Sequence, residues 1–374
     1  MKLQTVMTKI KNAFKLIRTD GFGAFWHKTK RLVFHKHRAL SRKLFHPKAG
    51  LELREEAKKY FAQKSEMFKL SIVIPVLGQH DITRFCLNKI IENKVGEIEI
   101  IVIDNGGDFE IKDDSKLGHL KILKPSAENI GVYPTFKLGM ENTKGDVVLF
   151  IHSDLIIDER GFDLLLTYVF ASDKEVGLVG FIGSDEINEN GGRSSGTTSN
   201  FLGKTYKYKD RVWTGTPASM WGERYDGLTS AVVLDGCSMA LRRSAWNEIG
   251  YRENRPLNHY YDRLISLQVL EAKYKVKVLG IACDHISGQT AMNEKKYFNT
   301  AQIWCTENNI APIKNHLGNI DWDMSMHEEA KRLFLKEWKD EKKKYSLFGY
   351  HFSRGYFFDK RSCFGRAVSN NRKT

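Results

Sequence analysis

The sequence lacks any long apolar run and is poor in the residues that mark secreted or fibrous chains. Its 374 residues include only 7 prolines and 5 cysteines. The longest apolar runs, such as Leu164–Phe170, fall far short of the ~20 residues that span a bilayer. No apolar stretch with a small-residue cleavage site follows the charged N-terminus. We therefore expect a chain that neither spans a membrane nor is exported.

The cysteines form no recognisable pattern. They lie far apart, their number is odd and no CxxC pair occurs, which argues against both a disulfide framework and a zinc site. The five are Cys86, Cys237, Cys283, Cys305 and Cys363. A reducing, cytoplasmic compartment fits this usage. Because 41% of the residues are hydrophobic and 11% are aromatic, the chain is expected to fold as a globule.

The net charge of +14 is unevenly distributed along the chain. Residues 1–68 carry 17 Lys and Arg against 5 Asp and Glu, and residues 331–374 carry 13 against 4. The middle, residues 69–330, has 29 basic and 36 acidic residues. We predict an acidic globule between two basic ends.

The N-terminal basic end has the pattern of an amphipathic helix. Apolar side chains recur at helical spacing among lysines from Leu3 to Ile17, and a second basic, aromatic stretch runs from Phe22 to Phe45. Such segments suit the inner face of an anionic membrane, to which the protein would bind peripherally. They would equally suit packing on the acidic globule. Binding to nucleic acid ranks below both.

From Lys69 onward, strand and helix patterns alternate. Strands are expected at 70–76, 98–103, 120–123, 146–151, 231–234 and 276–281, the last of the chain, and helices at about 81–92, 132–142, 243–249 and 261–272. This alternation predicts an α/β fold with a mostly parallel sheet. Ligands of such sheets bind beyond the carboxyl ends of the strands. The polar residues there are Asp104, Asn105, His152, Ser153 and Asp154, although each also suits a turn or a helix cap.

Residues Gly183–Ser230 are rich in Gly, Ser, Thr and Asn and resemble a long loop. A loop of this length within a compact domain is usually functional or disordered. It carries six aromatic residues, namely Phe201, Tyr206, Tyr208, Trp213, Trp221 and Tyr225. Their rings could stack on sugars of an acceptor, or they could pack on the core.

Six short motifs occur in a fixed order between residues 69 and 290. They are Ser71-Ile72-Val73-Ile74-Pro75, Val102-Ile103-Asp104-Asn105-Gly106, Asn129-Ile130-Gly131, Leu149-Phe150-Ile151-His152-Ser153-Asp154, Leu234-Asp235-Gly236-Cys237, and His259-Tyr260-Tyr261-Asp262 with His285-Ile286-Ser287-Gly288. In this order they resemble the family 2 glycosyltransferases of bacterial surface-polysaccharide and lipopolysaccharide synthesis. The resemblance implies the GT-A nucleotide-sugar fold and hexosyltransferase activity.

The resemblance also implies a divalent metal, with Mn²⁺ favoured over Mg²⁺. Sugar transfer needs a Lewis acid that stabilises the departing diphosphate. Asp154 corresponds to the last Asp of the family's DxD motif, and His285 to the second metal ligand. The first DxD position is His152, which implies either a variant metal site or a contact with the nucleotide. A buried histidine bonded to backbone is the alternative.

The remaining site residues are likewise implied by the resemblance. Asp262 corresponds to the base that deprotonates the acceptor hydroxyl, so transfer would invert the anomeric carbon; without the resemblance, a helix cap would explain it equally well. The implied nucleotide-sugar contacts are Pro75, Val76, Asp104, Asn129, Gly131, His152, Ser153, Asp235 and Gly236. Asp104 would accept a bond from a uracil-like ring N–H, which favours a UDP-sugar donor.

These expectations divide the chain into a basic extension (1–68), a GT-A domain (69–310, with 183–230 facing the acceptor) and a second basic extension (311–374). No Gln-x-x-Arg-Trp motif occurs, so we expect non-processive transfer to a glycan or lipid-linked saccharide. A catalytically inactive binding module on the same fold is the alternative. A Rossmann oxidoreductase is rejected, because residues 75–80 contain no GxGxxG turn.

Overall fold

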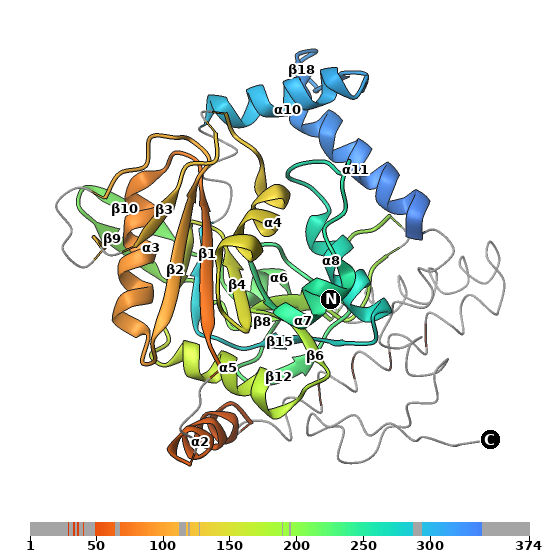
Figure 1. Ribbon diagram of the computed structural model, residues 1–374. Coiled ribbons are helices and arrows are strands. Elements are labelled where there is room, and N and C mark those ends of the chain that lie inside the picture. Colours follow the sequence, from red (N-terminus) through yellow and green to blue (C-terminus); the bar gives the residue numbers. More distant parts are fainter. Residues whose placement is uncertain are drawn as a thin grey trace, which may run out of the picture.

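The computed structural model shows an α/β protein built around one central sheet (Figure 1). It describes residues 49–63, 68–111, 117–118, 120–126, 128–188, 190–193, 196–286 and 294–338, together with positions 29, 33, 36 and 40. The predicted basic helix at 3–17, nearly all of 22–45 and the aromatic tail beyond 338 lie outside the described residues. The expectations attached to them remain predictions.

The central sheet is mixed and mostly parallel. Within the described chain its order is β12-β15-β6-β14-β4-β1-β2-β3. The bounds are β1 (Leu70–Val76), β2 (Ile98–Asp104), β3 (Lys121–Leu123), β4 (Val147–Ile151), β6 (Val176–Gly180), β12 (Leu228–Ser230), β14 (Ser238–Arg242) and β15 (Lys275–Leu279). Only β14 and β12 run antiparallel to their neighbours. The predicted mostly parallel mixed sheet flanked by helices is confirmed.

Helices cover both faces of this sheet, because the strands carry apolar side chains on each face. Ile72 and Ile74 of β1 belong to a core shared with α3 and α5, whereas Val73 belongs to a core shared with α4 and α8. The helices are α2 (Ala49–Ala62), α3 (His80–Asn93), α4 (Val132–Asn142), α5 (Phe162–Ser172), α6 (Ala218–Trp221), α7 (Arg243–Ile249), α8 (Tyr261–Glu271), α10 (Lys295–Glu307) and α11 (Trp322–Trp338). Among the described residues, none of these is long and apolar enough to cross a bilayer.

A short antiparallel ribbon brings distant residues to the carboxyl edge of the sheet. β5 (Leu155–Ile157) follows β4 after a tight turn and pairs with β16 (Cys283–His285), so that His285 lies opposite Leu155. The prediction that residues 276–281 form the last strand is therefore wrong. Two further short strands follow, β17 (Ile313–Lys314) and β18 (Ile320–Asp321).

The region Gly183–Ser230 differs from the long loop that its composition suggests. It contributes β7 (Ile182–Ser184), β8 (Thr198–Ser199) and β11 (Glu223–Arg224) to a small sheet with β13 (Val233–Leu234), and a hairpin of β9 (Thr205–Tyr208) and β10 (Arg211–Thr214). Most of its aromatic residues pack inward: Phe201, Tyr206 and Tyr225 are buried, and Phe85 contacts Tyr208 and Trp213. Trp221 alone among the six is exposed, at 51%.

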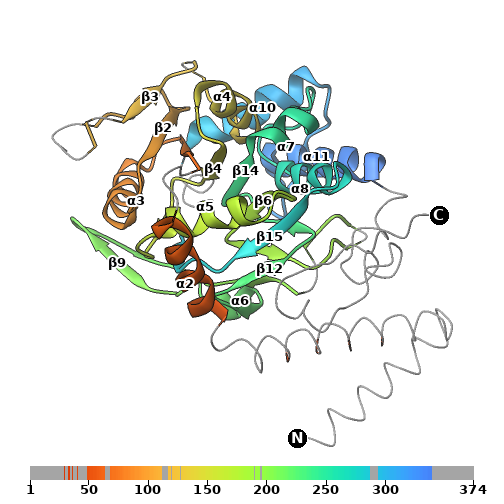
Figure 2. The same ribbon diagram turned by 60° about the horizontal axis from the view of Figure 1, so that its bottom comes forward.

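The C-terminal helices pack on the core. α10 lies above the sheet and α11 descends beside α8 (Figure 1). Ala330, Phe334 and Trp338 of α11 join the core that contains Tyr260 and Leu264. The described part of the predicted extension 311–374 is therefore integrated with the domain. Figure 2 brings forward α2, which packs below the sheet near α5.

Candidate active site

Three side chains converge where β4 and β16 end. Nε2 of His285 lies 3.2 Å from Oδ1 of Asp154 and 3.4 Å from Nδ1 of His152. One ligand atom from each residue lies within 4.8 Å of the other two. The turn after β4 supplies His152 and Asp154, and the β5–β16 ribbon carries His285 to them. The predicted pairing of Asp154 with His285 is thus present in space, and His152 joins it.

The protonation states of these groups depend on burial and on one another. Burial, followed by the charge of His285, lowers the pKa of His152. Burial would also lower the pKa of His285, but the charge and hydrogen bond of Asp154 outweigh it and raise that pKa. The pKa of Asp154 is lowered in return, against the effect of burial. The group therefore combines an ionised carboxylate with two imidazoles, and a cation that bound here would displace the proton of His285.

This donor set fits a divalent metal. Carboxylate oxygen is a ligand for hard cations such as Mg²⁺ and Mn²⁺, and imidazole nitrogen suits transition ions. The three residues could therefore hold such an ion.

A cavity of about 210 Å³ adjoins this cluster. It is lined by seven of the predicted site residues, namely Pro75, Val76, Asn129, His152, Ser153, Asp154 and His285, and by Leu77, Asn105, Val132, Asn258, Tyr261 and Tyr297. The lining comes from the ends of β1, β2 and β4, from β16 and from α10. The carboxyl edge of the sheet therefore carries the cavity, as the topology predicts.

Two asparagines that line this cavity each have one unpaired amide atom. Asn105 directs its Nδ2 to the carbonyl oxygen of Gly131, at 3.4 Å, and the Oδ1 of Asn258 accepts the backbone N–H of Val132 at 3.0 Å. The Oδ1 of Asn105 and the Nδ2 of Asn258 are buried and have no hydrogen-bond partner among the described residues. Buried polar atoms are normally satisfied, so these two amides are candidates for a contact with a ligand.

Asp104 does not take the position that the resemblance implies. It is fully buried, and its carboxylate accepts the backbone N–H groups of Gly106, Gly107 and Phe109 at 2.9–3.1 Å. These bonds hold the turn after β2, and Asp104 is not among the residues that line the cavity. The neighbouring Asn105 lines it instead.

Gly131 shapes the cavity through the backbone. Its φ is +84°, and a Cβ there would lie 2.4 Å from Cβ of Leu257. Only glycine accepts this conformation and this close approach without strain. Oδ1 of Asn129 accepts the N–H of Gly131 at 2.9 Å, which fixes the start of α4. Gly131 thus supports the cavity without lining it.

Asp235 and Asp262 form a neighbouring cluster around arginines. Nη1 of Arg193 contacts Asp235 and lies 3.5 Å from Oδ2 of Asp262. Burial would raise the pKa of Asp235, but Arg193 and then His285 hold it well below its usual value. Asp262 does not line the cavity, although its charge acts on His152.

Tyr261 contacts the metal-ligand group, since its hydroxyl lies 3.1 Å from Nε2 of His152. A Cβ on Gly236 would approach that hydroxyl to 2.1 Å, so the glycine leaves the space that the tyrosine occupies. The charges of Asp235 and Asp262 both act on His152. Asp154, His285 and Asp262 therefore belong to one region.

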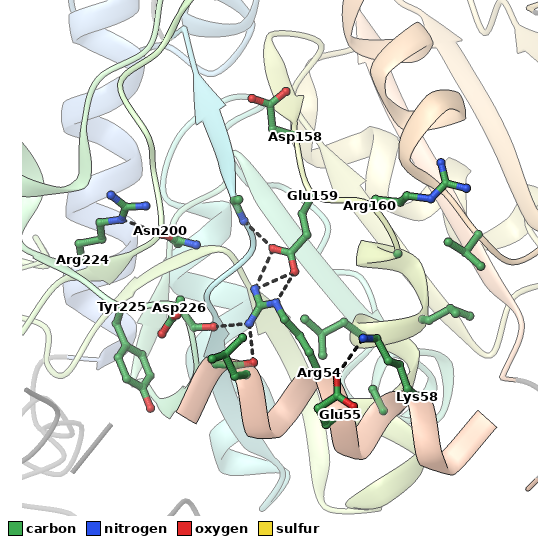
Figure 3. Close-up of a pocket in the computed structure, with 18 of the residues that line it drawn as sticks. Arg54, Glu55, Lys58, Asp158, Glu159, Arg160, Asn200, Arg224, Tyr225 and Asp226 are labelled. Carbon is green, nitrogen blue, oxygen red and sulfur yellow. Dashed lines mark hydrogen bonds and ion pairs between the residues drawn. The ribbon is translucent and has the colours of Figure 1, made fainter. Parts of the chain in front are cut away.

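A larger cavity, of about 1070 Å³, lies between α2 and the core (Figure 3). Arg54 binds Glu159 there through two hydrogen bonds of 2.7 and 2.9 Å, and also bonds the carbonyl oxygen of Asp226. Glu159 in turn accepts the N–H of Ala282. These contacts attach α2 to the domain, and no group of metal-ligating side chains among the described residues lies in this cavity.

Comparison with known proteins identifies the family. A model described as "Glycosyltransferase like family" matches residues 132–338, more than half of the chain. The chain belongs to this glycosyltransferase family. The predicted enzyme class is thereby confirmed, and the matched range includes α11, beyond the boundary at 310 that the sequence suggested.

One curated relative of this glycosyltransferase is distant in sequence. The chain is 27% identical over 122 residues to the glycosyltransferase GlyA of Streptococcus pneumoniae serotype 4, and this match covers 32% of this chain and 17% of that protein. The chain thus matches only about a sixth of the length of this curated relative.

The similarity to solved structures is loose. A mannosyltransferase, PcManGT of Pyrobaculum calidifontis in complex with GDP-Man and Mn²⁺, has a TM-score of 0.41 at 12% identity, and the match covers 84% of this chain and 89% of that one. S. aureus TarS has a TM-score of 0.38 at 14% identity, and the match covers 81% of this chain and 46% of that one. With TM-scores below 0.5, we draw no conclusion about this chain from these structures.

Several residues of the site carry no sequence signal of their own. Asn258 and Tyr297 belong to no motif, and Arg193 lies in a glycine-rich region with the composition of a loop. Asn105 is different, because it is the second residue after a predicted strand. The rule that ligands gather at strand ends identifies Asn105, whereas the other three depend on folding.

Proposed function

We propose that this glycosyltransferase moves a sugar from a nucleotide-sugar donor, with UDP-sugars favoured, to a hydroxyl of a glycan or lipid-linked saccharide, with inversion and without processivity. The grouping of His152, Asp154 and His285 beside a cavity with two unpaired asparagine atoms carries this proposal. A nucleotide-sugar donor needs metal-ligating groups for its diphosphate and a cavity for its base, and both lie here at one edge of the sheet.

The diphosphate would lie at the metal-ligand group. Asp154 and His285 would hold Mn²⁺, with His152 as a third ligand. A bound divalent ion supplies Lewis-acid stabilisation of the departing diphosphate. Asp154 contributes the only carboxylate of the group, so most of the electrostatic attraction for the cation comes from this residue.

The two asparagines would bind the base. Once their side chains turn toward the cavity, the amide of Asn105 can accept a ring N–H and the amide of Asn258 can donate to an adjacent carbonyl. Uracil and guanine both present an N–H beside a carbonyl, whereas cytosine and adenine do not. The cavity of about 210 Å³ has room for either base, and we favour uracil because the family resemblance implies a uracil contact at the end of β2. Asn105 would thus perform the role that the resemblance implies for Asp104.

Asp262 would act as the general base through one particular oxygen. Its Oδ1 already accepts the backbone N–H and the Nη1 of Arg263, at 2.8 and 2.9 Å. Among the described residues, the ion-pair contact of its Oδ2 is the one of 3.5 Å with Arg193, so a lone pair remains for a proton. The acceptor oxygen attacks the anomeric carbon, its proton passes to Oδ2, and the bond from that carbon to the diphosphate oxygen breaks. A single displacement of this kind inverts the carbon.

The proposed lipid-linked acceptor and the basic N-terminal region together favour binding of the enzyme to an anionic membrane surface. Residues 1–68 carry 17 basic and 5 acidic residues. We expect the full chain to sediment with vesicles that contain anionic lipid, and a chain without residues 1–66 to bind them at least about tenfold less tightly. Equal sedimentation of both would contradict membrane binding, and retention on DNA at physiological salt would favour nucleic acid instead.

A donor screen tests the central proposal. The protein is incubated with Mn²⁺ and UDP-, GDP-, CDP- and ADP-sugars, and release of nucleoside diphosphate is measured with and without saccharide acceptors. We expect release from UDP-sugars, abolished by chelation. Binding of nucleotide without release under any condition would support an inactive module, and preference for GDP would contradict the assignment of the base pocket.

A further inference from the structure

The C-terminal helices reach the donor cavity through Tyr297. This residue lies in the first turn of α10 and lines the cavity with Asn105 and Asn258. The sequence had treated the region after 310 as an extension of unknown role, but α10 and α11 form one unit. Ala301 and Cys305 of α10 are buried against Met326 of α11.

Asp323, near the start of α11, fixes the position of Tyr297. The Tyr297 hydroxyl donates to Oδ1 of Asp323 at 2.9 Å. His259 Nε2 lies 2.7 Å from the same oxygen and donates to it. His259 directly follows Asn258, so one carboxylate oxygen anchors a ring and a loop that both belong to the cavity wall.

The start of α10 is also bonded to both loops that follow β1 and β2. Oε1 of Glu294 accepts from Nε2 of Gln79 at 3.1 Å, and Nζ of Lys296 donates to the carbonyl oxygen of Gly106 at 2.5 Å. These contacts place the helix across the strand ends, over the side of the cavity where Asn105 lies. Tyr297 directly follows the anchored Lys296 in the chain.

α11 in turn is held firmly by the core. Phe334 contacts Tyr260 with ring centroids 5.4 Å apart, and Ala330 and Trp338 are buried in the same cluster. Nη2 of Arg255 contacts Glu337 near the end of the helix. Asp323 is therefore attached to a rigid element, which allows it to fix the geometry of the cavity wall.

We infer that Tyr297 contacts the nucleoside of the donor, and that Asp323 and His259 are positioning residues which hold Tyr297 and Asn258 against it. This inference rests on the proposed function, because it takes the cavity to be the donor site. The helix pair α10 and α11 then forms a part of the donor site that contacts the substrate. An aromatic ring supplies affinity for a base or ribose face at low entropic cost.

Binding of UDP in the presence of Mn²⁺, measured by calorimetry on the full chain, tests the inference. Tyr297→Ala is expected to raise the Kd at least about tenfold, the usual order for loss of an aromatic ring from a base contact. Tyr297→Phe keeps the ring but loses its anchor, so we expect a rise of about two- to fivefold. Asp323→Ala should resemble Tyr297→Phe or exceed it.

A conservative variant and a matched control separate positioning from general stability. Asp323→Asn still accepts the Tyr297 hydroxyl and should bind UDP within about threefold of the wild type. Ser325→Ala, on the same helix, removes the bond from the Ile313 N–H without touching the cavity. We expect this variant to lower the melting temperature but to leave the UDP Kd and the donor KM unchanged.

Kinetics give an independent reading. The donor KM should rise in Tyr297→Ala and Asp323→Ala, while the acceptor KM stays near the wild-type value. UDP binding by Tyr297→Ala within twofold of the wild type would overturn the inference, as would equal losses in Ser325→Ala and Asp323→Ala. If the wild type bound no nucleoside diphosphate at all, the proposed function itself would fail, which is a different result.

Discussion

Replacing Asp154 by asparagine is expected to lower the rate of sugar transfer by about 10³-fold, with the fold intact. Asp154 supplies the only carboxylate of the metal-ligand group, and its Oδ1 lies 3.2 Å from His285. An amide of the same shape keeps the packing but removes the charge that attracts the cation. A loss of several kcal/mol in transition-state stabilisation corresponds to a rate decrease of this order.

The measurement is turnover of the preferred donor as the Mn²⁺ concentration is varied. Asp154→Asn should need far more metal and should not reach the wild-type rate at saturation. Asp108→Asn is the matched control, because this carboxylate lies on the nearby loop after β2 and its side chain is 63% exposed. Wild-type turnover by Asp154→Asn at low Mn²⁺ would show that Asp154 does not take part in metal binding or catalysis.

The same cluster predicts how metal binding depends on pH. Against the opposing effect of burial, Asp154 raises the pKa of His285 above its usual value. The proton on His285 must therefore leave when a cation binds. We expect the apparent Mn²⁺ affinity to fall as the pH drops through that raised pKa, by up to about tenfold for each pH unit.

The central sheet could be predicted from the sequence because its signals are local. The residues of β1 and β2 are nearly all β-branched or aliphatic, and α4 begins directly after Gly131, as expected. By contrast, α5 and β6 were not predicted. The apolar run in α5 is short and continuous, a pattern that periodicity alone cannot distinguish from a buried strand.

Local signals also explain which site residues could be found. Asp154 lies three residues after a predicted strand and belongs to a recognisable motif, and His285 begins another such motif. Asp104 follows a strand too, but the turn after β2 uses its carboxylate for backbone N–H groups. Sequence alone does not distinguish a carboxylate that holds a turn from one that faces a ligand.

The other members of the site depend on long-range packing. Tyr297 reaches the cavity only because α11 packs on the core and Asp323 meets the Tyr297 hydroxyl. Arg193 comes from a region that the sequence presents as a loop, and it contacts two carboxylates, one from the turn between β13 and β14 and one from α8. These contacts between distant residues arise from the fold, so no residue spacing in the sequence predicts them.

Asp262→Asn tests the assignment of the base, and we expect kcat to fall by about 10²–10⁴-fold, the range for loss of a positioned general base. Because Asp262 does not line the cavity, the Kd for UDP should stay within about twofold of the wild type. The amide keeps the shape of the side chain, and its oxygen can still accept from Arg263. The variant therefore removes proton acceptance more than it removes structure.

Two observations distinguish a base from an anchor for arginines. Glu271→Gln, at the exposed end of the same helix, should keep the wild-type kcat. If Asp262 served only to hold Arg263, which bonds the carbonyl oxygen of Gly191, then Arg263→Gln would lose as much kcat as Asp262→Asn. If Asp262 is the base, Arg263→Gln should lose much less.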